Sequence, residues 1–257
     1  MEVECGNCCC GSAGAERQNV ILYTILSQKG HAAGSYHQAK HGCLCESRKT
    51  VCLKEPARTC QAASGVLVKT VSFVRNLLSF RLLPHEDQLL LLEACWAPLF
   101  LLGLAQEMVD FEVTETLAPS MLKRILLDGR SPSPDPQRSQ PTMAGVQRLQ
   151  SCLSKFRSLD LSPKEYAYLK GTILFNPDVP CLQTSLYIES LQREAQGALQ
   201  EVLLPQHPGD QGRFARILLS ASTLRSIPPA LISDLFFRPI IGSADILELV
   251  MEMLYMQ

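Results

Sequence analysis

The sequence has few charged residues and few aromatic ones. Asp, Glu, Lys and Arg make up 19% of the 257 residues and nearly cancel, leaving a net charge of −1, and aromatic residues contribute 6%. A protein with so small a net charge has no long-range field that would draw it to nucleic acid. Hydrophobic residues, at 46%, are numerous enough for one sizeable core. These values predict a folded protein that does not bind DNA through overall charge.

Sequence patterns of enzymes are also missing. There is no Gly-rich phosphate loop, no Gly-x-Ser-x-Gly and no His-Glu-x-x-His. The histidines stand apart from any nucleophile in a periodic context, and they are His31, His37, His41, His85 and His207. We therefore expect no catalytic residue, no cofactor and no enzymatic activity.

Cysteine is frequent but poorly spaced for metal binding. Structural zinc sites need four ligands, and these usually come as two Cys-x₂₋₄-Cys pairs. Cys5 and Cys8 have that spacing, while Cys43 and Cys45 are closer together. We expect no metal site and reduced thiols, as in the nucleus or cytosol, with a labile zinc site as the alternative. The N-terminus shows no secretory signal pattern.

The longest apolar run is Leu89–Ala105, which is interrupted only by the charge of Glu93. A helix that is apolar on every side lies in a protein core or in a membrane. At about 1.5 Å per residue this run falls just short of a bilayer of about 30 Å. Pro98 lies within it, and no Lys or Arg flanks it. The pattern favours a buried core helix, and no membrane contact is expected.

Two kinds of sequence organisation divide the chain. Residues 1–62 show little periodicity, and we expect them to be largely disordered. Residues 63–257 have helical periodicity, beginning at Ala63 and first stopped by Pro84. Residues 128–142 hold four prolines and are predicted to be a flexible surface loop.

Further helices follow from local signals. Ser162 and Glu165 are spaced as a capping box at the start of a helix. Long helices are predicted over Gln183–Leu204 and Gly212–Phe237, and an amphipathic final helix over Ser243–Leu254. Phe111–Val113 is a short extended segment that could form half of a β-hairpin. The sequence thus predicts an all-α domain with, at most, a small hairpin.

The residues Phe73, Arg75, Phe80, Asp87 and Gln88 have the spacing of a family signature. This pattern resembles that of nuclear-receptor ligand-binding domains, as does the Asn-Pro-Asp turn that follows a buried helix at residues 176–178. The resemblance covers residues 63–257 and implies a three-layer helical sandwich. The zinc modules that precede this domain in most nuclear receptors have no counterpart here, so the resemblance implies a protein that acts on DNA-bound receptors without contacting DNA.

The resemblance also assigns roles to residues near both ends of the domain. Arg75 and Glu252 match the basic and acidic residues that clamp a short partner helix in this family, although the basic residue is more often Lys. Leu249, Val250 and Met253 would line the same groove. In related receptors a Phe-x-x-Leu-Pro turn contacts the partner, and Phe80, Leu83 and Pro84 match it here. The alternative is that these three residues only fix the helix junction.

Two segments have the spacing of the L-x-x-L-L helices that occupy receptor grooves, with Ile at the fourth position. Leucines at i, i+3 and i+4 lie on one helix face and fill one apolar slot. The segments comprise Leu22, Ile25 and Leu26, and Leu122, Ile125 and Leu126. A core-facing short helix is the alternative for the second segment.

Together these patterns predict a transcriptional corepressor located in the nucleus and also in the cytoplasm. It would bind other nuclear receptors through its L-x-x-I-L segments, compete with coactivators and recruit corepressor proteins. The alternative is a ligand-regulated receptor that senses a small apolar molecule, since this fold can enclose an apolar cavity.

Overall fold

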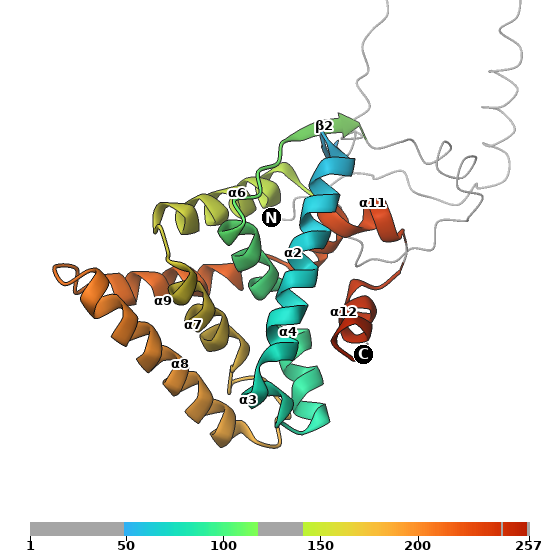
Figure 1. Ribbon diagram of the computed structural model, residues 1–257. Helices are drawn as coiled ribbons and strands as arrows, with labels where there is room; N and C mark the ends of the chain where they lie inside the picture. The colour runs from blue at the N-terminus through green and yellow to red at the C-terminus, as the bar shows by residue number, and fades with distance from the viewer. Residues whose placement is uncertain (1–48, 118–140, 243, 256–257) are drawn as a thin grey trace, which may run out of the picture. The chain divides into compact units, whose positions relative to one another are not determined.

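The computed structural model describes residues 49–117, 141–242 and 244–255 (Figure 1). The chain divides into two units, Met1–Glu46 and Ser47–Gln257, and every described residue belongs to the second. This unit is predominantly helical with one pair of short strands, which confirms the predicted fold class. Residues 49–62, expected to be disordered, form a strand and the first turns of a helix, and the rest of residues 1–62 lies outside the described part.

The two strands come from distant parts of the chain. β1 (Lys49–Leu53) pairs antiparallel with β2 (Val113–Leu117), in a register that places Val51 opposite Glu115. An extended segment was expected near Phe111–Val113, but its partner is not a neighbouring hairpin strand. The partner lies instead in the segment that was expected to be disordered. Val51 and Leu53 are buried, so β1 contributes to the core.

The first long helix, α2 (Pro56–Asn76), begins earlier and ends earlier than its periodicity suggested. It starts at Pro56 rather than Ala63, because proline suits a first helical position and Thr59 and Cys60 are buried. It ends before Leu77, whose backbone is extended. A single turn, α3 (Leu78–Arg81), then leads to Pro84, so Pro84 does not end α2 itself. The corner between α2 and the next helix is therefore built from two separate breaks.

The apolar run forms the centre of the domain. It lies in α4 (His85–Gln106), which continues through Pro98 and is buried over most of its length. α4 packs against α2 on one side and against α6 (Met143–Ser158) and α7 (Pro163–Leu174) elsewhere, which gives the layered arrangement (Figure 1). Among the described residues, α4 is the one helix long and apolar enough to cross a membrane. Its burial confirms the prediction of a core helix.

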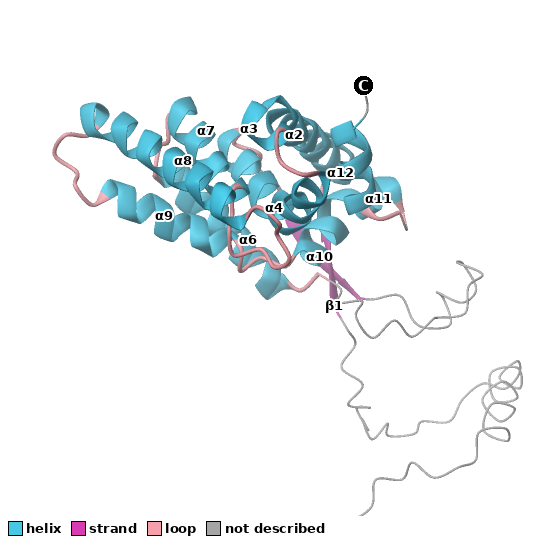
Figure 2. Cartoon of the chain, turned by 90° about the horizontal axis from the view of Figure 1, so that it is seen from below, coloured by secondary structure: helices cyan, strands magenta, loops and turns pink. Residues whose placement is uncertain are grey.

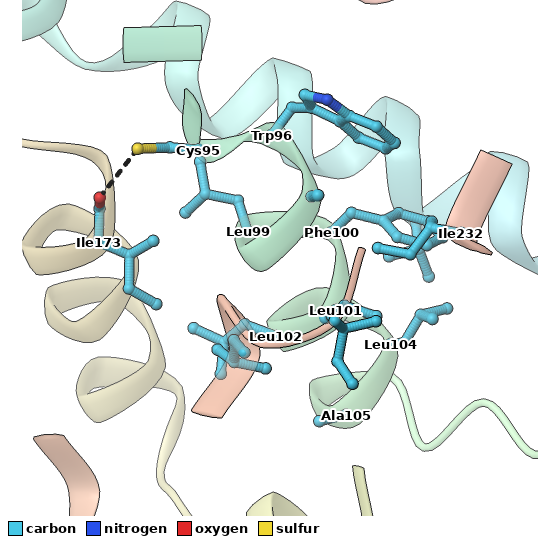
Figure 3. Packing of buried hydrophobic residues seen from close by; sticks show 14 of the residues in the cluster. Cys95, Trp96, Leu99, Phe100, Leu101, Leu102, Leu104, Ala105, Ile173 and Ile232 are labelled. Atoms are coloured by element: carbon cyan, nitrogen blue, oxygen red, sulfur yellow. Dashed lines mark hydrogen bonds between the residues drawn. The ribbon is translucent and has the colours of Figure 1, made fainter. Parts of the chain in front are cut away.

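Figure 3 shows how side chains close around α4. Leu99, Phe100, Leu101, Leu102 and Leu104 are each fully buried. The thiol of Cys95 donates to the carbonyl oxygen of Ile173 in α7, with a sulfur–oxygen distance of 3.2 Å. Burial raises the pKa of Cys95 to about 11, so the thiol stays protonated.

The capping box at the start of α7 is confirmed. The Ser162 hydroxyl accepts from the Glu165 backbone N–H, and the Glu165 carboxylate accepts from the Ser162 N–H at 2.6 Å. α7 then ends at Leu174, just ahead of the predicted turn at residues 176–178. α8 (Ser185–Gln206) follows nearly as expected and packs against both α7 and α9 (Arg213–Leu224) (Figure 2).

The expected single helix over Gly212–Phe237 is wrong. α9 ends at Leu224, and Pro228 and Pro229 restart the chain as α10 (Pro229–Ile232) because proline lacks the N–H that a continuous helix requires. The wider π-helix η1 (Ser233–Phe237) and α11 (Arg238–Ile241) complete this region. The final helix, α12 (Ile246–Tyr255), begins later and runs one residue further than predicted.

Candidate helix-binding groove

Three of the signature residues, Arg75, Phe80 and Gln88, lie where α2, α3, α4 and α12 come together. The helix axis turns sharply here, because Leu77 breaks α2 and Pro84 then starts α4. The Gln88 amide stabilises the corner by donating to the carbonyl oxygen of Leu83 at 2.9 Å and to that of Arg81 at 3.3 Å. Gln88 therefore has a structural role that its place in the signature had not revealed.

Asp87, the acidic residue of the signature, is fully buried and faces the start of α8. Its carboxylate accepts from the backbone N–H groups of Gln183 and Thr184 at 2.8 and 2.9 Å and from the Thr184 hydroxyl at 2.5 Å. Burial alone would raise the pKa of Asp87, but these hydrogen bonds outweigh it and lower the pKa below its ordinary value. Asp87 thereby attaches the start of α8 to the start of α4.

A cavity of about 170 Å³ lies at the junction, and we call it the α12 cavity. Its lining comes from the last turn of α2, from α3, from the first turn of α4 and from the last turn of α12. The residues are Arg75, Phe80, Arg81, Gln88, Leu254 and Tyr255. The two ends of the domain sequence thus meet in one small space.

α12 presents one apolar face to the rest of the domain. Ile246, Val250 and Leu254, spaced four residues apart, are buried, and α12 packs chiefly on α2. The Asp245 carboxylate accepts from the Leu247 N–H at 2.9 Å and so satisfies an otherwise unpaired donor at the start of the helix. The apolar face predicted from sequence is therefore present, with Val250 at its centre.

The remaining predicted groove residues differ in exposure. Leu249 and Met253 are half-buried against the core, and Glu252 is exposed. Arg75 is exposed at the end of α2. Because Arg75 shares the α12 cavity with Leu254 and Tyr255, this end of the predicted clamp already holds residues of α12. The clamp of Arg75 and Glu252 around a partner helix stays a prediction.

Sequence reasoning missed Tyr255, which joins the end of α12 to the start of α4. The Tyr255 hydroxyl donates to the Gln88 side-chain oxygen at 3.4 Å, and its ring lies 4.9 Å from the His85 ring, centroid to centroid. Burial raises the pKa of Tyr255, which keeps the hydroxyl a donor. The signal available in the sequence was an aromatic residue one position beyond the last one assigned to the helix.

The predicted repressor turn is mostly inside the protein. Phe80 and Leu83 are 1% and 4% exposed, whereas Leu78 and Leu82 beside them are each 67% exposed. Phe80 and Leu83 therefore hold the corner between α2 and α4, as the structural alternative expected. A partner-binding role for Phe80, Leu83 and Pro84 stays a prediction.

Both L-x-x-I-L segments lie outside the described residues, at positions 22–26 and 122–126. So does most of the loop predicted over residues 128–142, of which Thr142 is described as the residue that caps α6. Within the described residues, no group of three His, Cys, Asp or Glu side chains could hold a metal ion.

A model of the ligand-binding domain of nuclear hormone receptors matches residues 55–240. The chain therefore belongs to the nuclear hormone receptor family, and residues 55–240 are its ligand-binding domain. More particularly, it is 54% identical over 252 residues to nuclear receptor subfamily 0 group B member 2 from rat and from human, with 96% of this chain and 97% of each relative covered. Group B member 1 from pig is 44% identical over 79% of this chain but 47% of the relative.

The family fixes the broad function. The protein is a transcription regulator of the nuclear receptor class rather than an enzyme, it is located in the nucleus, and it interacts with other nuclear receptors. How it regulates transcription is a question of mechanism.

Proposed function

We propose that the protein is a transcriptional corepressor that engages DNA-bound receptors and does not itself bind DNA. Its L-x-x-I-L segments would occupy the coactivator grooves of those receptors, and its own groove would receive a helix from a corepressor protein. The observation that supports binding of a corepressor helix is the arrangement of residues at the junction of α2, α3, α4 and α12. There, the exposed cation Arg75 at the end of α2 lines a small cavity with the end of α12, and α12 carries the exposed carboxylate of Glu252.

The clamp has a physical basis in the ends of a helix. A short partner helix leaves N–H groups unpaired at its start and carbonyl groups unpaired at its end. Glu252 would accept from the N–H groups, and Arg75 would donate to the carbonyl groups. Because the end of α12 occupies part of the Arg75 side, Leu254 and Tyr255 must shift when a partner helix enters. The groove in the described arrangement is therefore partly closed.

The clamp is tested by measuring the affinity of a corepressor helix for single variants of the full chain. Glu252→Ala and Arg75→Ala should each weaken binding by about ten- to 150-fold, since hydrogen bonds to charged groups contribute about 1.5–3 kcal/mol. Melting temperature should hardly change, because both side chains are exposed. Glu248→Ala is the matched control, as Glu248 is also an exposed carboxylate on α12. Unchanged affinity in both variants would exclude the clamp.

The L-x-x-I-L segments need a separate test against a partner receptor. Replacing Leu26 and Leu126 together with Ala should reduce binding to an agonist-bound receptor domain at least a hundredfold, because buried anchor residues dominate such interfaces. Leu204→Ala, which removes an exposed leucine from α8, is the control for the loss of a leucine. Circular dichroism should show an unchanged fold. If the folded double variant still bound fully, repression would have to use another surface.

The ligand-regulated alternative finds no support in the centre of the domain. Phe100, Phe236 and Phe237 pack there with ring centroids 5.1 to 5.9 Å apart, and all three are buried. A cavity of about 680 Å³ lies at the start of α2, but its walls include Lys54, Arg58, Glu107, Asp110 and Glu112, which do not suit an apolar molecule. A panel of lipids and retinoids should leave the melting temperature unchanged if no such ligand binds.

The proposal also concerns where in the cell the protein is found. We expect a cytoplasmic fraction beside the nuclear one, because the described cysteines are free thiols, which persist in both reducing compartments. Fractionation of cells followed by detection of the chain would test this expectation.

A further inference from the structure

The α12 cavity has an unusual charge for its size. Two of its six lining residues, Arg75 and Arg81, carry guanidinium groups, and none carries a carboxylate. Arg81 forms no ion pair with any carboxylate in the described part of the chain. Tyr255 brings only a neutral hydroxyl to this space, and that hydroxyl meets the neutral amide of Gln88. The side chains that line the α12 cavity therefore include two positive charges and no negative charge.

The start of α4 forms one wall of this cavity. His85 and Gln88 stand in the first turn of a 22-residue helix, where the helix dipole favours anions. Two carboxylates share that turn, but both are engaged on the α8 side of the corner. Asp87 accepts from Gln183 and Thr184, and Glu86 accepts from the Gln183 amide. Neither lines the α12 cavity.

The cavity also has room for a group larger than the hydroxyl. A water molecule occupies about 30 Å³ in the liquid, so about 170 Å³ is ample for a phosphate group beside the ring. Tyr255 is 43% exposed and is the last residue of α12, where helix ends open most readily. An enzyme can therefore reach the hydroxyl when the end of the helix opens, and the modified side chain can then return.

We propose that Tyr255 is a phosphorylation site and that Arg75 and Arg81 hold its phosphate in the α12 cavity. A tyrosine kinase would transfer the γ-phosphoryl group of ATP to the phenolic oxygen. A new P–O bond forms as the bond to ADP breaks, and the phenolic proton is released. The phosphate brings about two negative charges and three acceptor oxygens to the two arginines. It would fasten the end of α12 in place and keep the groove closed to partner helices.

This inference goes beyond the proposed function, and its test needs no binding partner. The full chain is prepared with phosphotyrosine at position 255 and compared with the unmodified chain. The second pKa of the phosphate, measured by phosphorus NMR, should fall clearly below its usual value of about 6. The melting temperature should rise by about 2–4 °C, and hydrogen exchange of the α12 amides should slow about tenfold.

Two controls separate the cavity from a general effect of phosphate. Tyr187, on α8, is 45% exposed, and phosphotyrosine placed there should titrate with its ordinary pKa and leave α12 exchange unchanged. Arg81→Gln combined with Arg75→Gln should abolish the effects of phosphate at position 255. The phosphate-holding role is overturned if the phosphates at the two positions titrate alike, or if the modified α12 exchanges faster.

The accessibility of the hydroxyl is measured on the unmodified chain with ATP, magnesium and a recombinant tyrosine kinase domain. Mass spectrometry should find phosphate at Tyr255 in the wild-type chain and none at this position in Tyr255→Phe. Phosphate on Tyr187 but never on Tyr255 would overturn the proposal that position 255 is a modification site.

Discussion

Replacing Arg213, at the start of α9, should strongly destabilise the domain. Its guanidinium donates to the Glu165 carboxylate at 3.0 and 3.1 Å and to the carbonyl oxygens of Leu159 and Asp160 at 2.9 and 3.2 Å. The Glu165 side chain is 1% exposed and that of Arg213 is 9% exposed. One cation therefore holds the loop between α6 and α7, the start of α7 and the start of α9 together.

The expected magnitude follows from what Arg213→Ala leaves behind. Burial tends to raise the pKa of Glu165, and its bonds from Ser162 and Arg213 lower it below the ordinary value. Removing one partner of a buried ion pair typically costs about 3–5 kcal/mol, because the other charge stays buried without compensation. Two carbonyl groups lose a donor as well. For a domain of about 200 residues, a loss of this size lowers Tm by about 6–20 °C.

The assay is urea and thermal unfolding of the full chain at neutral pH, followed by circular dichroism. Arg216→Ala is the matched control, since Arg216 is three residues further along α9 and pairs with Asp210 at the surface. Exposed pairs contribute less than about 1 kcal/mol. If the two variants lost equal stability, the buried ion pair of Arg213 would contribute no more to stability than the exposed pair of Arg216.

Two other predictions concern stability as well. Gly103→Ala should destabilise the domain by about 1–3 kcal/mol, because the new Cβ would lie 2.7 Å from the Val66 side chain. Gly197→Ala on α8 should stabilise the domain by about 0.5–1 kcal/mol, because its Cβ would meet no atom within 4 Å. Urea unfolding measures both changes. Because the folded pKa of Asp87 is lowered, its contribution is complete above the ordinary carboxyl pKa and is lost as pH falls through the folded value. In Asp87→Asn the free energy of unfolding should fall less steeply below about pH 4 than in the wild type. The same pH dependence in both proteins would contradict this.

The sequence predicts features whose causes are local. The capping box of Ser162 and Glu165 spans four residues, and the apolar character of α4 is visible in one run that only Glu93 interrupts, so both were confirmed. The proline pair at Pro228 and Pro229 was also a local signal for a break. It was outweighed in the prediction by the apolar periodicity on both sides.

Features that depend on distant contacts could not be predicted in this way. β1 becomes a strand because β2, some sixty positions later in the chain, pairs with it. Arg213 is indistinguishable in sequence from the exposed Arg216 until the fold brings it to Glu165. The end of α2 at Leu77 has neither Gly nor Pro to mark it. Tyr255 closes the groove only because Gln88, 167 positions away, lies beside it.

The contacts of Tyr255 also set how firmly the groove is closed. A partner that binds only the open arrangement has its apparent affinity reduced by the fraction of molecules that are open. Tyr255 is held by one hydrogen bond of 3.4 Å to Gln88 and by one ring contact with His85, both at an exposed helix end. Such contacts contribute about 1–2 kcal/mol together, so the apparent affinity falls by about five- to thirtyfold. If a corepressor helix enters this groove as proposed, a small change at Tyr255, such as an added phosphate, would change the affinity of that helix.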